Sequence, residues 1–358
     1  MASGLALSVG AADEYPNDQN RLVLPRFNSP SSDQHNVEPV DPALGTPSRP
    51  HFFFAKALHC NGVPHMGCPT CSLCFDRVRP DGRIHRASEQ EFLSSLVPGV
   101  PVCVVVHGGL VWNAEYARFM RGYQWIRRAA PDYPLHVVFY RWPSSPGPQI
   151  ILPQLQGEQL AMRAENHGIH LANLLRRLPA ENPVSIVAHS LGTRCASSAL
   201  HLLAGGQIGD IRLRGPVRQR LYRVVFRAAS IDHHWLNPNQ RYGRALDSTE
   251  YFVNLQSRRD WALSLYPFRN GYSRPALGMT GFTPYDQVQL GSAVKKVRQI
   301  DVTHIVGIRH SERVYFRHTS ISRSVAEYLY FIDPSQTIGE RTPLPVIHDS
   351  SILSLPKR

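Results

Sequence analysis

The sequence has no apolar run approaching the roughly 18 residues that a membrane-spanning helix needs. Its first residues, Met-Ala-Ser-Gly-Leu-Ala-Leu-Ser, lack a basic segment, and their apolar stretch is too short for a secretory signal. Lys and Arg outnumber Asp and Glu by 39 to 27, but they form no long basic block and accompany no nucleic-acid-binding motif. We therefore expect a cytoplasmic protein without a transmembrane segment, whose partner is not nucleic acid.

Cysteine is too sparse for a disulfide scaffold, since the 358 residues contain six. Four of them, Cys60, Cys68, Cys71 and Cys74, follow the spacing C-x7-C-x2-C-x2-C, with Pro and Gly between them. Thiolates at such a spacing suit Zn²⁺, and a site closed by four ligands would be structural. An iron–sulfur cluster, a disulfide pair and no metal at all are the alternatives that the residues leave open.

Composition divides the chain into four parts. Residues 1–50 are rich in Pro, Asn, Ser and Asp and predict a disordered or loosely packed arm, and residues 333–358 predict a Pro- and Ser-rich tail. Residues 51–97 hold the cysteine cluster and predict a small zinc-binding module. Residues 98–332 have the apolar content and the length for one large α/β domain.

Strand and helix patterns alternate from residue 98 to residue 332. We expect strands at residues 101–106, 135–140, 184–189, 221–229, 250–256 and 297–302, and helices at 113–130, 157–178, directly after Ser190 and at 320–331. The run at residues 101–106 is continuously apolar, which is typical of a parallel strand that is buried on both faces. The sequence therefore predicts a mostly parallel, doubly wound sheet with helices on both faces. His167 and His170 are expected on the surface of the helix at 157–178.

The strongest chemical signal is the segment Val-Ser-Ile-Val-Ala-His-Ser-Leu-Gly at residues 184–192, which is followed by a helical pattern. In a nucleophile elbow a strand turns sharply into a helix and exposes a serine hydroxyl, and the residues two before and two after the serine must be small. Ala188 and Gly192 meet that demand around Ser190. An ordinary strand followed by a Ser-capped helix is the alternative interpretation.

Glycines and acidic residues follow other predicted strands. The pair Gly108-Gly109 comes after the first apolar run, where backbone N–H groups could approach an oxyanion without hindrance from a Cβ. Asp232 and Asp260 each follow a later strand, and the chain order of serine, acid and histidine is that of an α/β-hydrolase triad. Taken alone, each acid is better explained as a helix N-cap and each late histidine as a loop-surface residue. The late histidines are His304, His310 and His318.

In this order, over about residues 98–332, the segments resemble an uncharacterised bacterial α/β-hydrolase family that is catalogued as a domain of unknown function. The matching segments are His107-Gly108-Gly109, Trp142-Pro143-Ser144, Ala188-His189-Ser190-Leu191-Gly192, Ala228-Ala229-Ser230-Ile231-Asp232, residues 257–263, Ile300-Asp301-Val302 and a late histidine. The family shows His-Gly-Tyr, Ser-Trp-Pro-Ser, Ala-His-Ser-Met-Gly, Ala-Pro-Asp-Ile-Asp, Ser-x-x-Asp-x-Ala-Leu, Ile-Asp and a His-Ser-Tyr-like segment. Gly109 replaces the family's aromatic residue, and Ser230 replaces an Asp.

The resemblance implies an α/β-hydrolase fold with Ser190 as nucleophile, Asp260 as acid and a late histidine as base. We prefer His318 for its spacing from the final helix, and His310 is the alternative because it keeps the family's His-Ser pair. The implied oxyanion hole uses the backbone N–H groups of Leu191 and Gly109 or its neighbour. The expected site rim consists of His107, Gly108, His189, Asp232 and Trp142, with His233, His234 and Trp235 shaping the pocket.

The sequence thus predicts a serine hydrolase, an esterase, lipase or thioesterase-like enzyme that cleaves a carboxylic ester through an acyl-enzyme on Ser190. Its expected substrate is a small-molecule or lipid ester, and the chemistry needs no cofactor. Two alternatives belong to other classes of protein. One is a catalytically silent interaction protein on the hydrolase scaffold, and the other is a zinc-containing nucleic-acid-binding protein.

Overall fold

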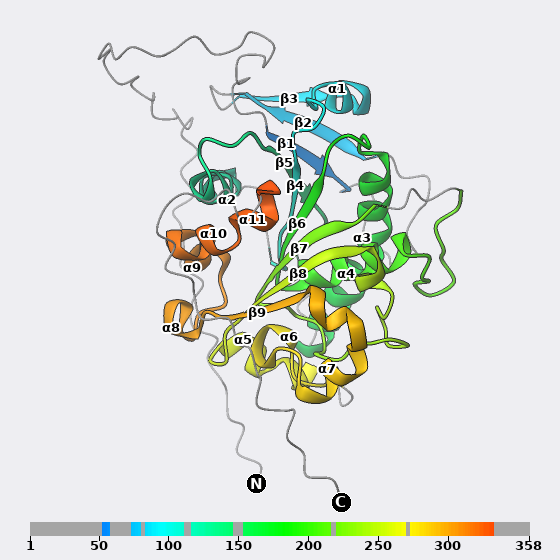
Figure 1. The fold of residues 1–358 in the computed structure, drawn as a ribbon, viewed down its shortest axis with the longest axis vertical. Helices are drawn as coiled ribbons and strands as arrows, with labels where there is room; N and C mark the ends of the chain where they lie inside the picture. The colour runs from blue at the N-terminus through cyan, green and yellow to red at the C-terminus, as the bar shows by residue number, and fades with distance from the viewer. Residues whose placement is uncertain are drawn as a thin grey trace, which may run out of the picture. The chain divides into compact units, whose positions relative to one another are not determined.

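A computed structural model describes residues 52–57, 73–79, 83–110, 116–145, 153–215, 220–269 and 273–332. The predicted arm at 1–50 and tail at 333–358 lie outside these residues, as do Cys60, Cys68 and Cys71. The described residues form one nine-stranded sheet flanked by helices (Figure 1). Among them no helix combines the length and the apolar character that crossing a membrane requires.

Six strands after residue 98 run parallel to one another, in the order β5-β4-β6-β7-β8-β9. They are β4 (Val102–Val106), β5 (His136–Arg141), β6 (Val184–His189), β7 (Tyr222–Arg227), β8 (Thr249–Gln256) and β9 (Val297–Asp301). All six were expected from the sequence, within one or two residues at each end. The prediction of a mostly parallel α/β sheet is therefore confirmed.

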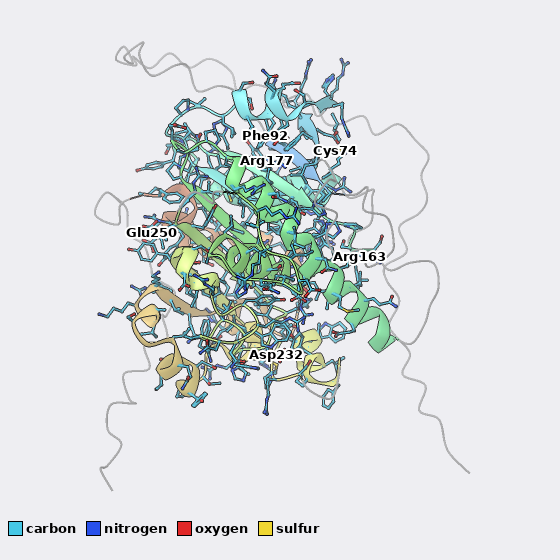
Figure 2. The ribbon with its side chains drawn as sticks, turned by 90° about the vertical axis from the view of Figure 1, so that its right-hand side faces the viewer. Cys74, Phe92, Arg163, Arg177, Asp232 and Glu250 are labelled. Atoms are coloured by element: carbon cyan, nitrogen blue, oxygen red, sulfur yellow. The ribbon has the colours of Figure 1, made fainter. Side chains whose placement is uncertain are left out.

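Three further strands extend this sheet on its N-terminal side, where the sequence predicted a separate module. β1 (Phe52–Lys56) lies parallel to β5 and antiparallel to β2 (Cys74–Val78), and β2 pairs with β3 (Ile84–Ala87). The short helix α1 (Glu89–Ser94) places Phe92 against aromatic rings of β1 and β2. Figure 2 shows Phe92 and Cys74 at this end of the molecule. The expected boundary at residue 97 is therefore wrong for the described residues, because their backbone hydrogen bonds continue the sheet.

Helices pack on both faces of the sheet, because successive strand side chains point to opposite sides. Val102 and Val104 of β4 join a buried cluster with residues of α3 (Pro153–Arg177) and α4 (Leu191–Leu203). Cys103 and Val105 join a second cluster with residues of α2 (Tyr116–Ala129) and of the last helices. Figure 1 shows α3 and α4 on one side of the sheet and α2, α9, α10 and α11 on the other.

Short helices fill the segments after β7, β8 and β9. They are η1 (Ala245–Ser248), α5 (Trp261–Ser264), η2 (Tyr266–Arg269), α6 (Leu277–Thr280), α7 (Pro284–Leu290), η3 (Gly291–Lys296), α8 (Thr303–Val306), α9 (Glu312–Arg317), α10 (Thr319–Ser324) and α11 (Ala326–Tyr330). The single closing helix predicted at 320–331 is thus two short helices, which Val325 separates with φ −111° and ψ −1°.

His167 and His170 are buried, which corrects the expectation that they lie on the surface of α3. The helix packs against the sheet on one side and against α4 on another, so few of its positions face solvent. Burial, together with the neighbouring His170 and Arg163, lowers the pKa of the His167 imidazole to about 3, so His167 is neutral. These histidines belong to the core.

Candidate active site

The turn at the end of β6 holds Ser190 in a strained backbone conformation, with φ 51° and ψ −127°. Non-glycine residues seldom adopt positive φ, and where they do the surrounding structure has to stabilise it. The N–H of Ser190 donates to the carbonyl of Arg227 at 3.0 Å. A Cβ at Gly192 would lie 2.4 Å from the His107 carbonyl oxygen, so only glycine fits there without a shift. The predicted sharp turn and its demand for a small residue are confirmed.

Ser190, His310 and Asp260 form a continuous chain of hydrogen bonds. The Oγ atom of Ser190 lies 2.8 Å from Nε2 of His310, and Nδ1 of His310 lies 2.9 Å and 3.1 Å from the two carboxylate oxygens of Asp260. An ionised carboxylate only accepts hydrogen bonds, so Nδ1 carries the proton and Nε2 offers its lone pair to the serine hydroxyl. In this geometry a histidine can accept the proton of an attacking serine.

Asp260 is fully buried at the start of α5 and is held there by the backbone. Its Oδ1 atom accepts hydrogen bonds from the N–H groups of Ala262 at 3.0 Å and Leu263 at 3.1 Å. The sequence left open whether this residue is a helix N-cap or an acid that contacts a histidine. The Asp260 carboxylate makes both contacts, since it caps α5 and is hydrogen bonded to Nδ1 of His310. The cap therefore fixes the carboxylate that orients His310.

His318 is not part of this chain of hydrogen bonds, which corrects our preference for it as the base. It links α9 to α10, and within the described residues its side chain has no hydrogen bond to Ser190 or Asp260. Its spacing from the final helix was misleading because α9 and α10 intervene. The better signal was the His-Ser pair, since Ser311 follows His310 and caps α9 by accepting from the N–H of Arg313.

A buried charge cluster anchors the segment that carries His310. His189, the residue before the serine, donates from Nε2 to the backbone carbonyl of His310 at 2.8 Å. Glu312 accepts from Arg118 at 2.9 Å and from Arg227 at 3.3 Å. Burial alone raises the pKa of the Glu312 carboxyl, but the charges of Arg118, His189 and Arg227 lower it to about 2. Glu312 is therefore ionised at neutral pH, behind the histidine of the candidate site.

The loop after β4 approaches the serine closely at its two glycines. A Cβ at Gly108 would lie 3.0 Å from Cβ of Ser190, and a Cβ at Gly109 would lie 3.0 Å from Cδ1 of Leu191. Leu191 is the first residue of α4, so its N–H has no acceptor within the helix. The residues expected to form an oxyanion hole are thus adjacent to one another beside Ser190.

All five expected rim residues are buried, and three of them brace the loops around the site. The rings of His107 and Trp142 stack with centroids 5.5 Å apart, and the indole N–H donates to the His107 carbonyl at 2.9 Å. Burial lowers the pKa of His107 to about 4, although its backbone contact with Gly108 raises it. Asp232 accepts from the Tyr266 hydroxyl at 2.7 Å and from the N–H of Arg274 at 2.9 Å. Both carboxylate oxygens of Asp232 therefore accept hydrogen bonds from groups other than His310.

One neighbour of the serine, Ser230, was not predicted from the sequence to be a site residue. The Oγ atom of Ser230, in the segment after β7, lies 3.3 Å from Oγ of Ser190. Thr193 supports this contact, because its hydroxyl accepts from the N–H of Ser230 at 3.2 Å and donates to the Ser190 carbonyl at 2.6 Å. The sequence offered one signal for this residue, which was its departure from the Asp at that position in the family that the chain was taken to resemble.

The cysteine cluster is represented in the described residues by Cys74, which is buried in β2. Cys60, Cys68 and Cys71 lie outside those residues. In the part of the chain that the structure describes, no group of three His, Cys, Asp or Glu side chains is placed to hold a metal ion. The structural zinc site therefore stays a prediction from the sequence.

Comparison of the chain with protein-family models, with curated proteins and with solved structures finds no match. The resemblance to the uncharacterised hydrolase family therefore stays a hypothesis that rests on the ordered segments. Any functional proposal has to come from the geometry of the site.

Proposed function

We propose that the protein is a serine hydrolase that cleaves a carboxylic ester. The observation that carries the proposal is the hydrogen-bond chain from Ser190 through His310 to Asp260, with the serine on a strained turn. A serine is a weak nucleophile until a base accepts its proton, and that base needs a group that fixes its tautomer. Both requirements are met here at hydrogen-bond distance.

The proposed reaction has two acyl-transfer steps. Oγ of Ser190 attacks the ester carbonyl carbon while Nε2 of His310 takes its proton, and the imidazolium then protonates the leaving alcohol. Water attacks the resulting acyl-serine with His310 again as base, which releases the acid and restores the serine. Asp260 holds the imidazole and stabilises its charged form. The N–H groups of Leu191 and Gly109 are the proposed donors to the oxyanion.

The order of the parts along the sheet supports the α/β-hydrolase fold as the scaffold. The serine follows β6, the acid follows β8 and the histidine follows β9, so all three come from segments after parallel strands. Open parallel sheets keep their sites at the carboxyl ends of the strands. The interaction-protein alternative is favoured where such residues fail to converge, and here they are hydrogen bonded to one another.

Hydrolysis of 4-nitrophenyl butyrate by purified protein tests the proposal. We expect Ser190→Ala to lower kcat/KM by a factor on the order of 10⁴ or more, as loss of a triad nucleophile does. Ser230→Ala is the matched variant, because it removes the neighbouring hydroxyl and leaves the bond from Ser190 to His310. Its rate should stay closer to wild type. No turnover by the folded wild type, or equal turnover by Ser190→Ala, would overturn the proposal.

A further inference from the structure

Arg194 is a fully buried cation for which the described residues supply no hydrogen-bond acceptor. It is 0% exposed, and its Nε, Nη1 and Nη2 atoms all lack partners there. The guanidinium carries five N–H donors and stays charged in proteins. Buried polar groups are nearly always satisfied, so the acceptors for Arg194 have to come from water or from a bound ligand.

No neighbouring carboxylate in the described residues accepts a hydrogen bond from Arg194. Its Cζ atom lies 4.6 Å from the centre of the Trp235 ring, which is a stacking contact that leaves the N–H groups unused. Glu165 is hydrogen bonded by Arg241 at 2.8 Å and 2.5 Å. Burial lowers the pKa of Arg194, but Tyr242, Tyr266 and Glu165 raise it above its ordinary value, so the side chain remains a cation.

Arg194 belongs to the same helix that begins at the nucleophile. It comes four residues after Ser190, one turn along α4, and helical side chains lean toward the N-terminus of their helix. On that general geometry we expect the guanidinium to lie on the side of α4 nearer to the serine. Trp235, which stacks on it, belongs to the segment after β7 that also places Ser230 at 3.3 Å from the serine hydroxyl.

We propose that Arg194 binds a carboxylate of the substrate, so that the ester cleaved at Ser190 carries a second, anionic group. This inference rests on the proposed function. A carboxylate matches the planar guanidinium with two parallel hydrogen bonds. It also supplies the opposite charge that a buried cation needs, which a neutral ester oxygen does not. The formal charge of +12 on the chain favours approach of such a substrate.

Two pairs of esters test the proposal, each matched in size and differing in charge. One pair is 4-nitrophenyl hemiglutarate and 4-nitrophenyl valerate, with the charge on the acyl side. The other is 4-carboxyphenyl valerate and 4-carbamoylphenyl valerate, with the charge on the leaving group. In at least one pair we expect wild type to favour the charged member in kcat/KM by about tenfold to a hundredfold, as charged hydrogen bonds allow.

The readout is the ratio of the two kcat/KM values within each enzyme. Arg194→Met should abolish the preference, and Arg194→Lys should keep part of it, because lysine retains the charge without the planar fork. Arg177→Met is the control for charge alone, since Arg177 pairs with Glu89 at the far end of α3 and is labelled in Figure 2. Its ratio should equal that of wild type. No preference in either pair, or one that survives in Arg194→Met, would overturn the inference.

Calorimetric titration with glutarate separates this inference from the proposed function, because it needs no turnover. Wild type and Arg177→Met should bind glutarate, and Arg194→Met should not. Binding by wild type without ester turnover would support the anion site and contradict the hydrolase proposal. Turnover of neutral esters without glutarate binding or charge preference would support the hydrolase proposal and contradict the anion site. Arg194 would then be a structural partner of Trp235.

Discussion

The Glu312→Gln substitution removes the carboxylate that accepts hydrogen bonds from Arg118 and Arg227 behind His310. Glutamine keeps the size and an acceptor oxygen but loses the charge. Burial raises the pKa of Glu312, yet Arg118 and the other nearby charges bring it from an ordinary value of 4.5 to about 2. Since one pKa unit is worth about 1.4 kcal/mol, the ionised carboxylate contributes roughly 3 kcal/mol to folding at neutral pH. We expect Glu312→Gln to lose about that amount.

The pH dependence of this loss follows from the sign of the pKa change. The pKa of Glu312 is lower in the folded state than in the unfolded chain, so its contribution is complete above about pH 5 and disappears as the pH falls toward 2. Near pH 3.5 roughly 2 kcal/mol of it remains. The difference in unfolding free energy between wild type and Glu312→Gln should therefore shrink by about 1 kcal/mol between pH 7 and pH 3.5.

Urea unfolding followed by tryptophan fluorescence measures this difference at several pH values. The control is Glu250→Gln, because Glu250 pairs with Arg223 but its side chain is 35% exposed, and exposed ion pairs contribute less than about 1 kcal/mol. Figure 2 labels Glu250. A loss in Glu312→Gln no larger than that of the control, or one that does not change on acidification, would show that the ionised carboxylate does not stabilise the fold in this way.

Three further predictions use other parts of the structure. Gly192→Ala places a Cβ against backbone oxygens and should destabilise by about 1–3 kcal/mol in urea unfolding, whereas Gly157→Ala in α3, with open space at its Cβ, should not destabilise. The amide of Asp260→Asn can still cap α5 but favours the wrong tautomer of His310, so kcat should fall by about 10⁴ while the melting temperature changes little. If the cysteine cluster binds zinc, atomic emission should find about one zinc per chain in wild type and none in Cys68→Ser or Cys71→Ser. Wild type that contains no metal would contradict the prediction of a zinc site.

The turn at Ser190 was predictable because its determinants are local. Steric crowding dictates a small residue at position 192, and the sequence shows a glycine there. The central parallel strands were predictable for a similar reason, since β4 is a continuous apolar run that is buried on both faces, and β6 is buried along its whole length. Asp260 could be proposed as an acid because a parallel sheet gathers the ends of its strands on one edge.

The rest of the site depends on contacts between distant segments. His310 and His318 have similar local sequence contexts, and only the packing of the loop after β9 decides which of them reaches Ser190. The three N-terminal strands are four or five residues long, and the pairing of β1 with β5, which joins them to the sheet, lies outside any local pattern. Arg194 shows no unusual pattern either, because its lack of acceptors is a property of the folded core.

The most direct test of the account is labelling of the folded protein with a fluorophosphonate probe, which reacts with an activated serine. Wild type and His318→Ala should label, while Ser190→Ala and His310→Ala should not, because His310 contacts both the serine and Asp260. Absence of labelling in wild type would contradict the proposal of an activated serine. Labelling that is lost in His318→Ala but kept in His310→Ala would contradict the assignment of the base.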